Sequence, residues 1–202
     1  MDRPASMLER VSGKARMTAV RYFGEKALRY ETKRAGTPKW AGEDRKVREY
    51  LLDLPEGTTI LDIPCGTGRF FQFYRERGFK VLGIDISPDM IAEAQKHVGD
   101  DIKLKIGSIF NIGLSEAFDV VICTRFLNLI EAEDVKRVLA EMQRVAKYRI
   151  IFTLRVRQTN PSGHYHSPHS ISLVEESLLP EWKIGRNEPM YQEDYRSIEV
   201  IR

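Results

Sequence analysis

The sequence predicts an α/β fold: a doubly wound, mostly parallel seven-stranded sheet that ends in an antiparallel hairpin and is preceded by N-terminal helices. Three observations lead to this prediction. From residue 58 onward, short apolar runs alternate with helical patterns, which is typical of parallel strands joined by right-handed crossovers. A glycine turn within LDIPCGTGRF, residues 61–70, separates the first strand from the first helix of this series. Two strand-like segments, WKIGRN and YRSIEVIR, close the chain.

Local signals place the elements of the sheet in order. Gly78 is positioned to end the helix that follows the glycine turn. Ser87 and Pro88 supply an N-cap and a first-turn proline for the next helix. A turn around Glu188-Pro189 is expected to join the two closing strands. The other strands are expected at 58–63, 80–85, 102–107, 118–124 and 149–156, and the helices at 68–78, 87–98, 132–147 and 170–181.

The N-terminal part differs from the rest in pattern and charge. Apolar residues spaced by three and four predict helices over 17–30 and 43–54, with a loop or hinge in AGTPKWAG between them. Residues 1–50 carry 13 Lys+Arg against 7 Asp+Glu, whereas the remainder carries 19 against 22. Such a segment suits an anionic substrate, an acidic partner or RNA, or it forms a solvated helix face. We divide the chain into an N-terminal helical segment, 1–42, and a main domain, 43–202.

Composition limits the class of protein. With 202 residues, of which 42% are hydrophobic, the chain can bury one sizeable core. No apolar run approaches the roughly 20 residues of a membrane-spanning helix, and no apolar stretch typical of a secretion signal follows the first residues. The two cysteines, Cys65 and Cys123, lie in or beside apolar runs and not in a spaced disulfide framework. These features predict a cytoplasmic protein with no membrane partner.

The glycine turn predicts a cofactor that contains a nucleoside. Gly66 and Gly68 let the backbone pass close beneath a ligand at the carboxyl edge of the sheet. Asp85 ends the second strand, 17 residues beyond Gly68, where it can accept hydrogen bonds from a ribose. A dinucleotide site requires G-x-G-x-x-G, but Phe71 stands at the third glycine position and would obstruct the close helix approach.

Residues 62–68, DIPCGTG, resemble the D-x-G-x-G-x-G motif of class I S-adenosylmethionine (SAM)-dependent methyltransferases. VLGIDISPDMIAEAQ at 81–95, IGSIFNIGL at 106–114 and FDVVICTRFLNLI at 118–130 are similar to later segments of that family, in the same order. The resemblance covers residues 45–156 closely and the closing helix and strand pair loosely. It implies SAM as the cofactor, methyl transfer as the activity, and N-terminal helices that fold over the site as a lid.

The resemblance also implies roles for the residues of the cofactor site. The Asp85 carboxylate would bind the ribose hydroxyls, Ile86 would pack on adenine, and Ser108 would meet the adenine amine. Because Pro64 replaces the first glycine of the motif and lacks an N–H, the two later glycines are expected to approach SAM most closely. The implied cofactor-binding residues are Asp62, Pro64, Cys65, Gly66, Thr67, Gly68, Asp85, Ile86, Ser108, Ile109, Thr124 and Arg34.

The catalytic residues are not assigned by these motifs, since methyl transfer needs a base only when the acceptor must lose a proton. His164 and His166 lie in the predicted loop 157–169, at the ligand-bearing edge of the sheet, where an imidazole can accept a proton near neutral pH. Arg125 and Tyr30 are the other candidates. No carboxylate or cysteine completes a metal-ligand set around the histidines, so no metal is predicted.

The acceptor is predicted to be a small molecule that carries negative charge. Arg34, Arg125, Arg155 and Arg157, with Lys33 and Trp40, could hold a carboxylate or a phosphate, or they are ordinary surface cations. Methylation of RNA or a protein, and a non-catalytic SAM-binding partner subunit, are the open alternatives. RNA is not favoured, because CTRF after the fourth strand lacks the Asn/Asp-Pro-Pro-aromatic tetrapeptide associated with methylation of base amines. The sequence predicts neither the acceptor atom nor the oligomeric state.

Overall fold

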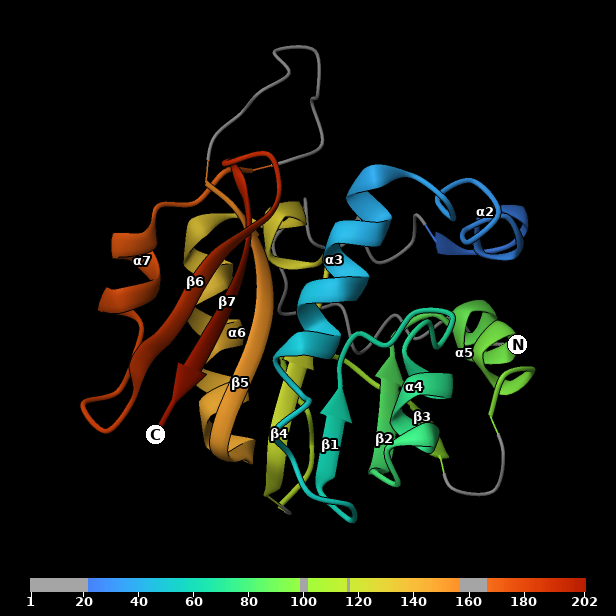
Figure 1. Cartoon of the computed structure of the whole chain (residues 1–202), viewed down its shortest axis with the longest axis horizontal. Coiled ribbons are helices and arrows are strands. Elements are labelled where there is room, and N and C mark those ends of the chain that lie inside the picture. Colours follow the sequence, from blue (N-terminus) through green and yellow to red (C-terminus); the bar gives the residue numbers. More distant parts are fainter. Residues whose placement is uncertain (1–21, 99–101, 116, 157–166) are drawn as a thin grey trace.

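The computed structural model describes residues 22–98, 102–115, 117–156 and 167–202, which form one seven-stranded sheet with helices on both faces (Figure 1). The strands are β1 (Thr59–Asp62), β2 (Lys80–Asp85), β3 (Ile102–Ile106), β4 (Phe118–Cys123), β5 (Ala146–Arg155), β6 (Lys183–Tyr191) and β7 (Tyr195–Ile201). Their order in the sheet is β3-β2-β1-β4-β5-β7-β6. The first five pair in parallel, and β7 is antiparallel to both β5 and β6, so six strands run one way and one runs the other. The predicted doubly wound sheet with its antiparallel hairpin is confirmed.

Helices cover both faces of this sheet. On one face pack α3 (Pro38–Glu49), α4 (Phe71–Glu76) and α5 (Pro88–Gln95). On the other face pack α6 (Ala132–Val145) and α7 (Ile171–Glu176). The short helix α2 (Glu25–Leu28) lies next to α5, beyond the end toward which β1 and β2 point, and the first turn of α3 lies at the same end (Figure 1). The N-terminal elements thus stand over the carboxyl ends of parallel strands, where ligands bind in open α/β sheets.

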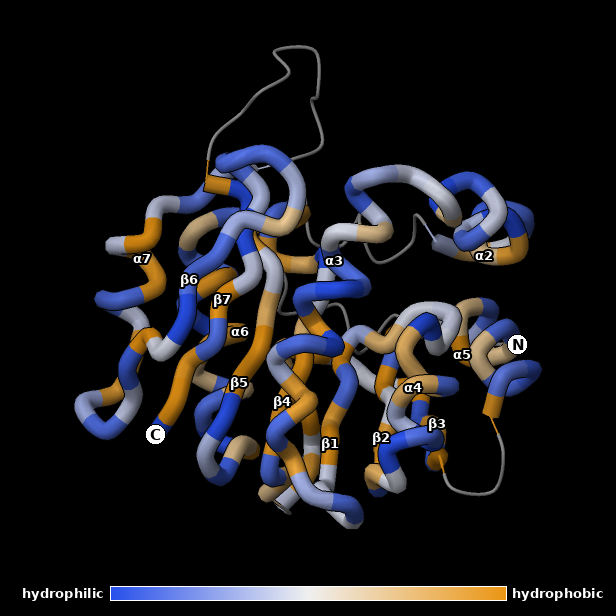
Figure 2. Tube along the Cα trace, viewed as in Figure 1, coloured by the Kyte–Doolittle hydropathy of each residue, from blue (hydrophilic) through white to orange (hydrophobic). Residues whose placement is uncertain are grey.

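Two apolar clusters fill the space between the sheet and its helices. Because side chains alternate along a strand, Leu61 and Val121 belong to the cluster under α6, whereas Ile60 and Val120 belong to the cluster under α3 and α4. Strands that are apolar on both sides are typical of a parallel sheet, and Figure 2 shows β1 and β4 largely in the colour of hydrophobic residues. None of the helices in the described ranges is both long and apolar enough to cross a membrane.

The predicted signals at helix ends are confirmed. The Ser87 hydroxyl accepts a hydrogen bond from the Met90 N–H at 3.2 Å, and Pro88 is the first residue of α5. Gly78 follows α4 with a φ of 66°, the left-handed conformation that favours glycine after a helix. These local contacts fix where α4 ends and α5 begins, and so they position the loops between strands and helices.

The predicted loop before the second helix is wrong in its second half. The helix α3 begins at Pro38, not at residue 43, because Thr37 caps it: the Thr37 hydroxyl accepts a hydrogen bond from the Trp40 N–H at 3.3 Å. Pro38 occupies the first helical position, where its missing N–H costs nothing. Of the helix predicted over 17–30, only residues 22–30 are described, and α2 is the helical part of them.

The predicted turn at Glu188-Pro189 is also wrong. Glu188 pairs with Ser197 and Pro189 with Arg196, so β6 continues through both residues. The pairing shifts register after Pro189, which accommodates a residue without an N–H in an edge strand. The hairpin turns later, beyond the end of β6. The chain therefore brings Tyr195, the first residue of β7, back to the carboxyl end of β5.

Phe71 occupies the space that two glycines leave open. A Cβ on Gly68, whose φ is +79°, would lie 2.3 Å from Cδ2 of Phe71, and a Cβ on Gly83 would lie 2.8 Å from its Cζ. The Phe71 side chain is fully buried. The helix α4 therefore packs against β2 through the ring of Phe71. This packing does not need the third glycine of a dinucleotide fingerprint.

We expect Gly68→Ala to lower the free energy of unfolding by about 2–4 kcal/mol, because left-handed strain adds to overpacking against Phe71. Gly57→Ala is the matched control: Gly57 has a φ of +81°, but no described atom lies within 4 Å of the added Cβ. That variant should lose only about 1–2 kcal/mol. Urea denaturation measures both, and equal losses would contradict the packing role of Phe71.

Candidate functional site

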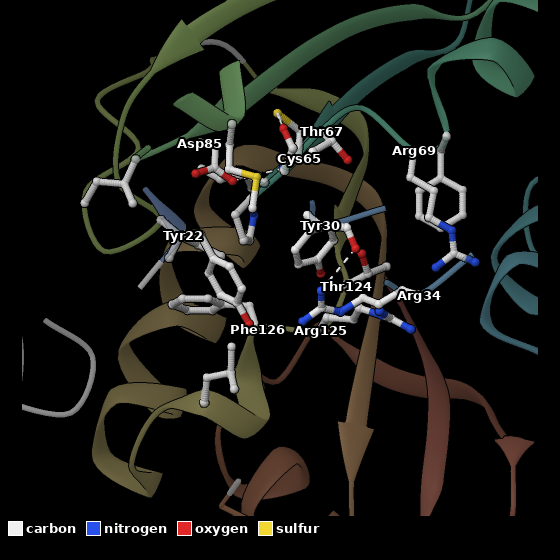
Figure 3. Close-up of a pocket in the computed structure, with 18 of the residues that line it drawn as sticks. Tyr22, Tyr30, Arg34, Cys65, Thr67, Arg69, Asp85, Thr124, Arg125 and Phe126 are labelled. Atoms are coloured by element: carbon white, nitrogen blue, oxygen red, sulfur yellow. Dashed lines mark hydrogen bonds between the residues drawn. The ribbon is translucent and has the colours of Figure 1, made fainter. Parts of the chain in front are cut away.

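A cavity lies at the carboxyl ends of β1, β2 and β4, under the N-terminal segment, which we define as residues 22–42. Figure 3 shows Asp85 and Cys65 on one side of this cavity and Arg34 and Arg125 on the other, with Tyr30 between them. The first side comes from the loop after β1 and the last residue of β2, and the second from the N-terminal segment and the residues that follow β4. One wall is thus backbone and carboxylate, and the other is aromatic and cationic.

Asp85 joins the glycine loop to the start of α5. Its Oδ2 accepts a hydrogen bond from the Gly66 N–H and its Oδ1 accepts one from the Ser87 N–H, both at 2.9 Å. Burial raises the pKa of Asp85 to about 6, although the N–H groups of Ser87, Gly66 and Ile86 act in the opposite direction. At neutral pH the carboxylate is therefore mostly ionised and fixed in orientation, with further lone pairs available to a ligand.

Asp62 lies behind the glycine loop. Its side chain is buried and accepts a hydrogen bond from the Tyr74 hydroxyl at 3.1 Å. Burial raises the pKa of Asp62 to about 7; the Tyr74 hydroxyl opposes this shift and the Asp85 carboxylate adds to it. The described contact of Asp62 therefore ties the end of β1 to α4.

The N-terminal segment contacts both loops that flank the cavity. The Thr67 hydroxyl of the glycine loop donates a hydrogen bond to the Glu31 carboxylate at 2.7 Å. The Ser87 hydroxyl, which caps α5, donates to the Tyr22 carbonyl oxygen at 2.8 Å. These contacts hold the segment over the carboxyl edge of the sheet, so a ligand in the cavity would be covered.

Glu43 of α3 is the centre of a buried charge cluster. Its side chain is 0% exposed, and its Oε2 accepts hydrogen bonds from Arg69 and Arg125, both at 2.5 Å. Its Oε1 accepts a hydrogen bond from the Tyr195 hydroxyl at 3.1 Å. The Arg69 guanidinium also lies 3.6 Å from the ring centre of Trp40 and donates to its carbonyl oxygen. One carboxylate thus joins α3, the glycine loop, the end of β4 and the start of β7.

Arg125 is held from several sides. Its φ is 59°, a strained conformation for an arginine, and its N–H donates to the Thr153 hydroxyl at 2.7 Å. Its guanidinium donates to the Tyr30 hydroxyl. Burial acts to lower the pKa of Arg125, but Glu43 and Tyr30 raise it on balance. Burial raises the pKa of Tyr30 against the effect of Arg125, so Tyr30 stays protonated at neutral pH.

Arg34 stacks on the same tyrosine. Its guanidinium lies 3.9 Å from the ring centre of Tyr30, and its Nη1 donates to the Tyr30 carbonyl oxygen at 3.1 Å. The ring of Tyr22 meets that of Tyr30 edge-on, with centres 5.4 Å apart. Arg34 thus has a fixed position on the cavity wall, and the aromatic pair shields it from solvent on one side.

Most of the predicted cofactor-binding residues line the cavity. Of the two glycines expected to approach the cofactor, Gly66 lines the cavity, whereas Gly68 faces Phe71. Asp62 is likewise not part of the wall. The predicted residues that do line it are Pro64, Cys65, Gly66, Thr67, Asp85, Ile86, Ser108, Ile109, Thr124 and Arg34.

The catalytic candidates divide into two pairs. Arg125 and Tyr30 line the cavity and are hydrogen-bonded to each other. His164 and His166 lie outside the described residues, as does Arg157 of the predicted anion-binding set. His169, from the same predicted loop, is buried, and its Nε2 lies 3.0 Å from the Leu127 carbonyl oxygen. Within the described ranges no group of three or more His, Cys, Asp or Glu side chains could hold a metal ion.

Several wall residues are absent from the sequence-based predictions, and three of them carry a charge or a hydroxyl on the side of the cations. Lys39 lies in the first turn of α3, which was predicted as a loop, although Thr37-Pro38 is a recognisable helix start. Arg69 directly follows the glycine motif, which is the only signal for it. Tyr195 reaches the cavity because β7 pairs with β5, and no local pattern predicts that contact.

Comparison with known proteins finds methyltransferases similar to part of the chain. A family model described as a methyltransferase domain matches residues 60–149. The dTDP-4-amino-2,3,4,6-tetradeoxy-D-glucose N,N-dimethyltransferase of Saccharopolyspora spinosa is 33% identical over 108 residues, 52% of this chain and 43% of that protein. The malonyl-[acyl-carrier protein] O-methyltransferase of Pectobacterium atrosepticum is 32% identical over 97 residues, 48% of this chain and 38% of that protein. The matched part of the chain spans less than half the length of these curated relatives.

The fold agrees with this match. The crystal structure of magnesium protoporphyrin IX methyltransferase from Synechocystis, solved with bound S-adenosylhomocysteine (SAH), superimposes with a TM-score of 0.79 at 18% sequence identity. The superposition covers 93% of this chain and 99% of the other. The family model covers the strands and loops that build the glycine turn, Asp85 and the end of β4. On this evidence residues 60–149 match the methyltransferase domain family, and the described fold is the one seen in magnesium protoporphyrin IX methyltransferase.

Proposed function

We propose that this chain is a SAM-dependent methyltransferase that transfers a methyl group to a small, negatively charged acceptor. The observation that carries the proposal is a cavity that has the glycine loop and Asp85 on one side and the cations and aromatic rings of the N-terminal segment on the other. Both curated relatives are named as methyltransferases, one of nitrogen and one of oxygen. A site with these two unlike walls suits a cofactor and an acceptor bound side by side.

The cavity fits SAM at the residues that the family motifs imply. The Asp85 carboxylate is ionised and faces the cavity, as an acceptor of ribose hydroxyls must. Ile86 and Ile109 offer apolar surface for adenine, and Ser108 lies beside them. A Cβ on Gly66 would meet no described atom within 4 Å, so the backbone there leaves room for a ligand to lie directly against it.

When bound, SAM supplies a methyl group on a positively charged sulfur, and a nucleophile displaces that sulfur in line. The chain has to hold the acceptor atom about 3 Å from the methyl carbon and to exclude water. Tyr30 and Trp40 line the cavity from the N-terminal segment, which supports a lid role for residues 1–42 over a methyltransferase domain, 43–202. Protonated Tyr30 would donate a hydrogen bond and would not act as a base.

The proposal of an anionic acceptor rests on the cationic side chains that line the cavity. Arg34 and Arg125 line the cavity, and Arg155, at the end of β5, lies near the ring of the wall residue Tyr195. Cations that line a cavity support a small anion more than an extended nucleic acid, which would need them on the outer surface. Cys65 and Cys123 are both free and buried, which supports a reducing compartment such as the cytoplasm.

Calorimetric titration with SAH, followed by transfer of labelled methyl from SAM to pooled small carboxylic and phosphoric acids, tests the proposal. We expect SAH to bind in the micromolar range and at least one acid to become labelled. Failure to bind SAH would overturn the proposal. If RNA or protein became labelled and no small acid did, the result would support methylation of RNA or protein instead. Tight SAH binding without turnover of any acceptor would indicate a non-catalytic subunit.

A further inference from the structure

We propose that Lys39 binds a carboxylate group of the methyl acceptor and takes up a proton as it does so. The inference rests on the proposed function. To that function it adds Lys39 as a binding residue, a carboxylate as the group it binds, and the uptake of a proton by Lys39. Lys39 occupies the first turn of α3, lines the cavity, and holds its Nζ 3.9 Å from the ring centre of Tyr195. It is half-buried, whereas the Tyr195 ring beneath it is almost fully buried.

Lys39 makes no ion pair with a carboxylate in the part of the chain that the structure describes. The two carboxylates that act on it electrostatically are those of Glu43 and Asp194. Glu43 accepts hydrogen bonds from Arg69, Arg125 and Tyr195, and Asp194 lies 3.9 Å from Arg155. Both are therefore already engaged by arginines, while the ammonium of Lys39 faces the cavity over an aromatic ring.

The described charged groups that act most strongly on Lys39 leave one positive charge unmatched. The cations are Lys39, Arg125 and Arg155, and the carboxylates are Glu43 and Asp194. Arg69 shares Glu43 but also lies 3.7 Å from Asp44, so this further pair leaves the excess unchanged. A ligand with a single negative charge neutralises this part of the wall, and this favours a carboxylate over a phosphate dianion.

The same surroundings bring the protonation of Lys39 into a range where a bound ligand can change it. Burial lowers its pKa to about 8, and the nearby Arg155 and Arg125 add to the effect against Glu43 and Asp194. A carboxylate beside Nζ acts in the opposite direction and restores the ammonium. A carboxylate that binds near pH 8 therefore draws a proton from solvent onto Lys39, and its affinity falls when the pH rises above about 8.

The alternative role for a lysine of this kind is that of a base, and it predicts the opposite pH dependence. A base must be neutral, so turnover would rise as the pH passes 8. Carboxylate binding requires the charged form, so affinity is lost over the same interval. From pH 7 to pH 9 the protonated fraction of a group with a pKa of about 8 falls about tenfold.

The experiment uses the full chain saturated with SAH and a set of small carboxylic acids, each paired with its methyl ester and its primary amide. We expect ligand-observed NMR to detect acids and not their esters or amides, and we expect the affinity of a detected acid to fall about tenfold from pH 7 to pH 9. At pH 8, titration in two buffers of different ionisation enthalpy should show uptake of about half a proton per ligand.

Three variants make the test specific to Lys39. Lys39→Met should weaken acid binding at least tenfold and abolish proton uptake, with SAH binding unchanged. Lys39→Arg should keep acid binding but lose the change between pH 7 and pH 9, because arginine stays charged. Lys26→Met, at an exposed lysine of α2 outside the cavity wall, should behave as the unmodified chain.

The outcomes separate this inference from the proposed function. Absence of SAH binding in the unmodified chain would overturn the proposed function itself. SAH binding with no preference for acids over esters, or with acids bound equally by Lys39→Met, would overturn the role of Lys39 and leave the cofactor assignment standing. Turnover that rises through pH 8 and is lost in Lys39→Arg would identify Lys39 as a base instead.

Discussion

Asp85→Ala is expected to weaken SAH binding more than 100-fold. The carboxylate would contribute hydrogen bonds from the ribose hydroxyls, and it already fixes the Gly66 and Ser87 N–H groups at 2.9 Å. Hydrogen bonds to a charged group contribute about 1.5–3 kcal/mol each, and 100-fold corresponds to about 2.7 kcal/mol. Isothermal titration of SAH measures the loss, with circular dichroism to confirm that the variant is folded.

The pH dependence of the same binding gives an independent check. Because the pKa of Asp85 is raised to about 6, its carboxyl group becomes protonated as the pH falls through 6, and SAH affinity should fall with it. Asp85→Asn should bind weakly at every pH and lose this dependence. Glu76→Ala, at an exposed carboxylate of α4, is the control and should leave affinity unchanged. An Asp85→Ala variant that binds within fivefold of the unmodified chain would contradict the role of this carboxylate.

The elements around Asp85 could be predicted from sequence because local chemistry determines them. The strand β2 spans the six residues predicted for it, and the cap and proline that begin α5 adjoin it in the chain. A glycine turn followed at fixed distance by a carboxylate places both groups at one edge of a parallel sheet, whatever the rest of the chain does. Sequence reasoning therefore placed Gly66 and Asp85 on the cavity wall, and their contact with a cofactor stays a prediction.

The opposite wall could be predicted only in part, through Arg34, Arg125 and Tyr30, because contacts between distant parts of the chain bring its other residues together. Tyr195 reaches Glu43 across 152 positions, and only the pairing of β7 with β5 brings them together. The hairpin turn was misplaced because proline usually ends a strand, whereas here a register shift absorbs Pro189. Thr37-Pro38 was a local signal for α3 that the surrounding glycines outweighed.

Glu43→Ala is expected to lower the free energy of unfolding by about 3–5 kcal/mol, the usual cost of removing one partner from a buried ion pair. The carboxylate is fully buried and lies 2.5 Å from both Arg69 and Arg125, whose side chains are only 10% and 17% exposed. Without it, two guanidinium groups remain desolvated next to each other. Glu49→Ala, at a half-exposed end of the same helix, breaks the ion pair with Lys46 and should cost less than about 1 kcal/mol.

Glu43→Gln distinguishes charge from packing in this cluster. Glutamine keeps the volume and an oxygen for Tyr195, so a loss close to that of Glu43→Ala would assign the effect to the missing charge. Urea denaturation of Glu43→Gln, Arg69→Met and the double variant should give a coupling of about 1–3 kcal/mol, because removal of Arg69 relieves part of the unmatched positive charge. Independent, additive losses would mean that Glu43 does not hold α3 to the glycine loop through Arg69. A coupling in the expected range would mean that Glu43 and Arg69 stabilise each other. The Glu43 carboxylate, which also binds Arg125, would then link α3 and the cations of the cavity wall to the glycine loop.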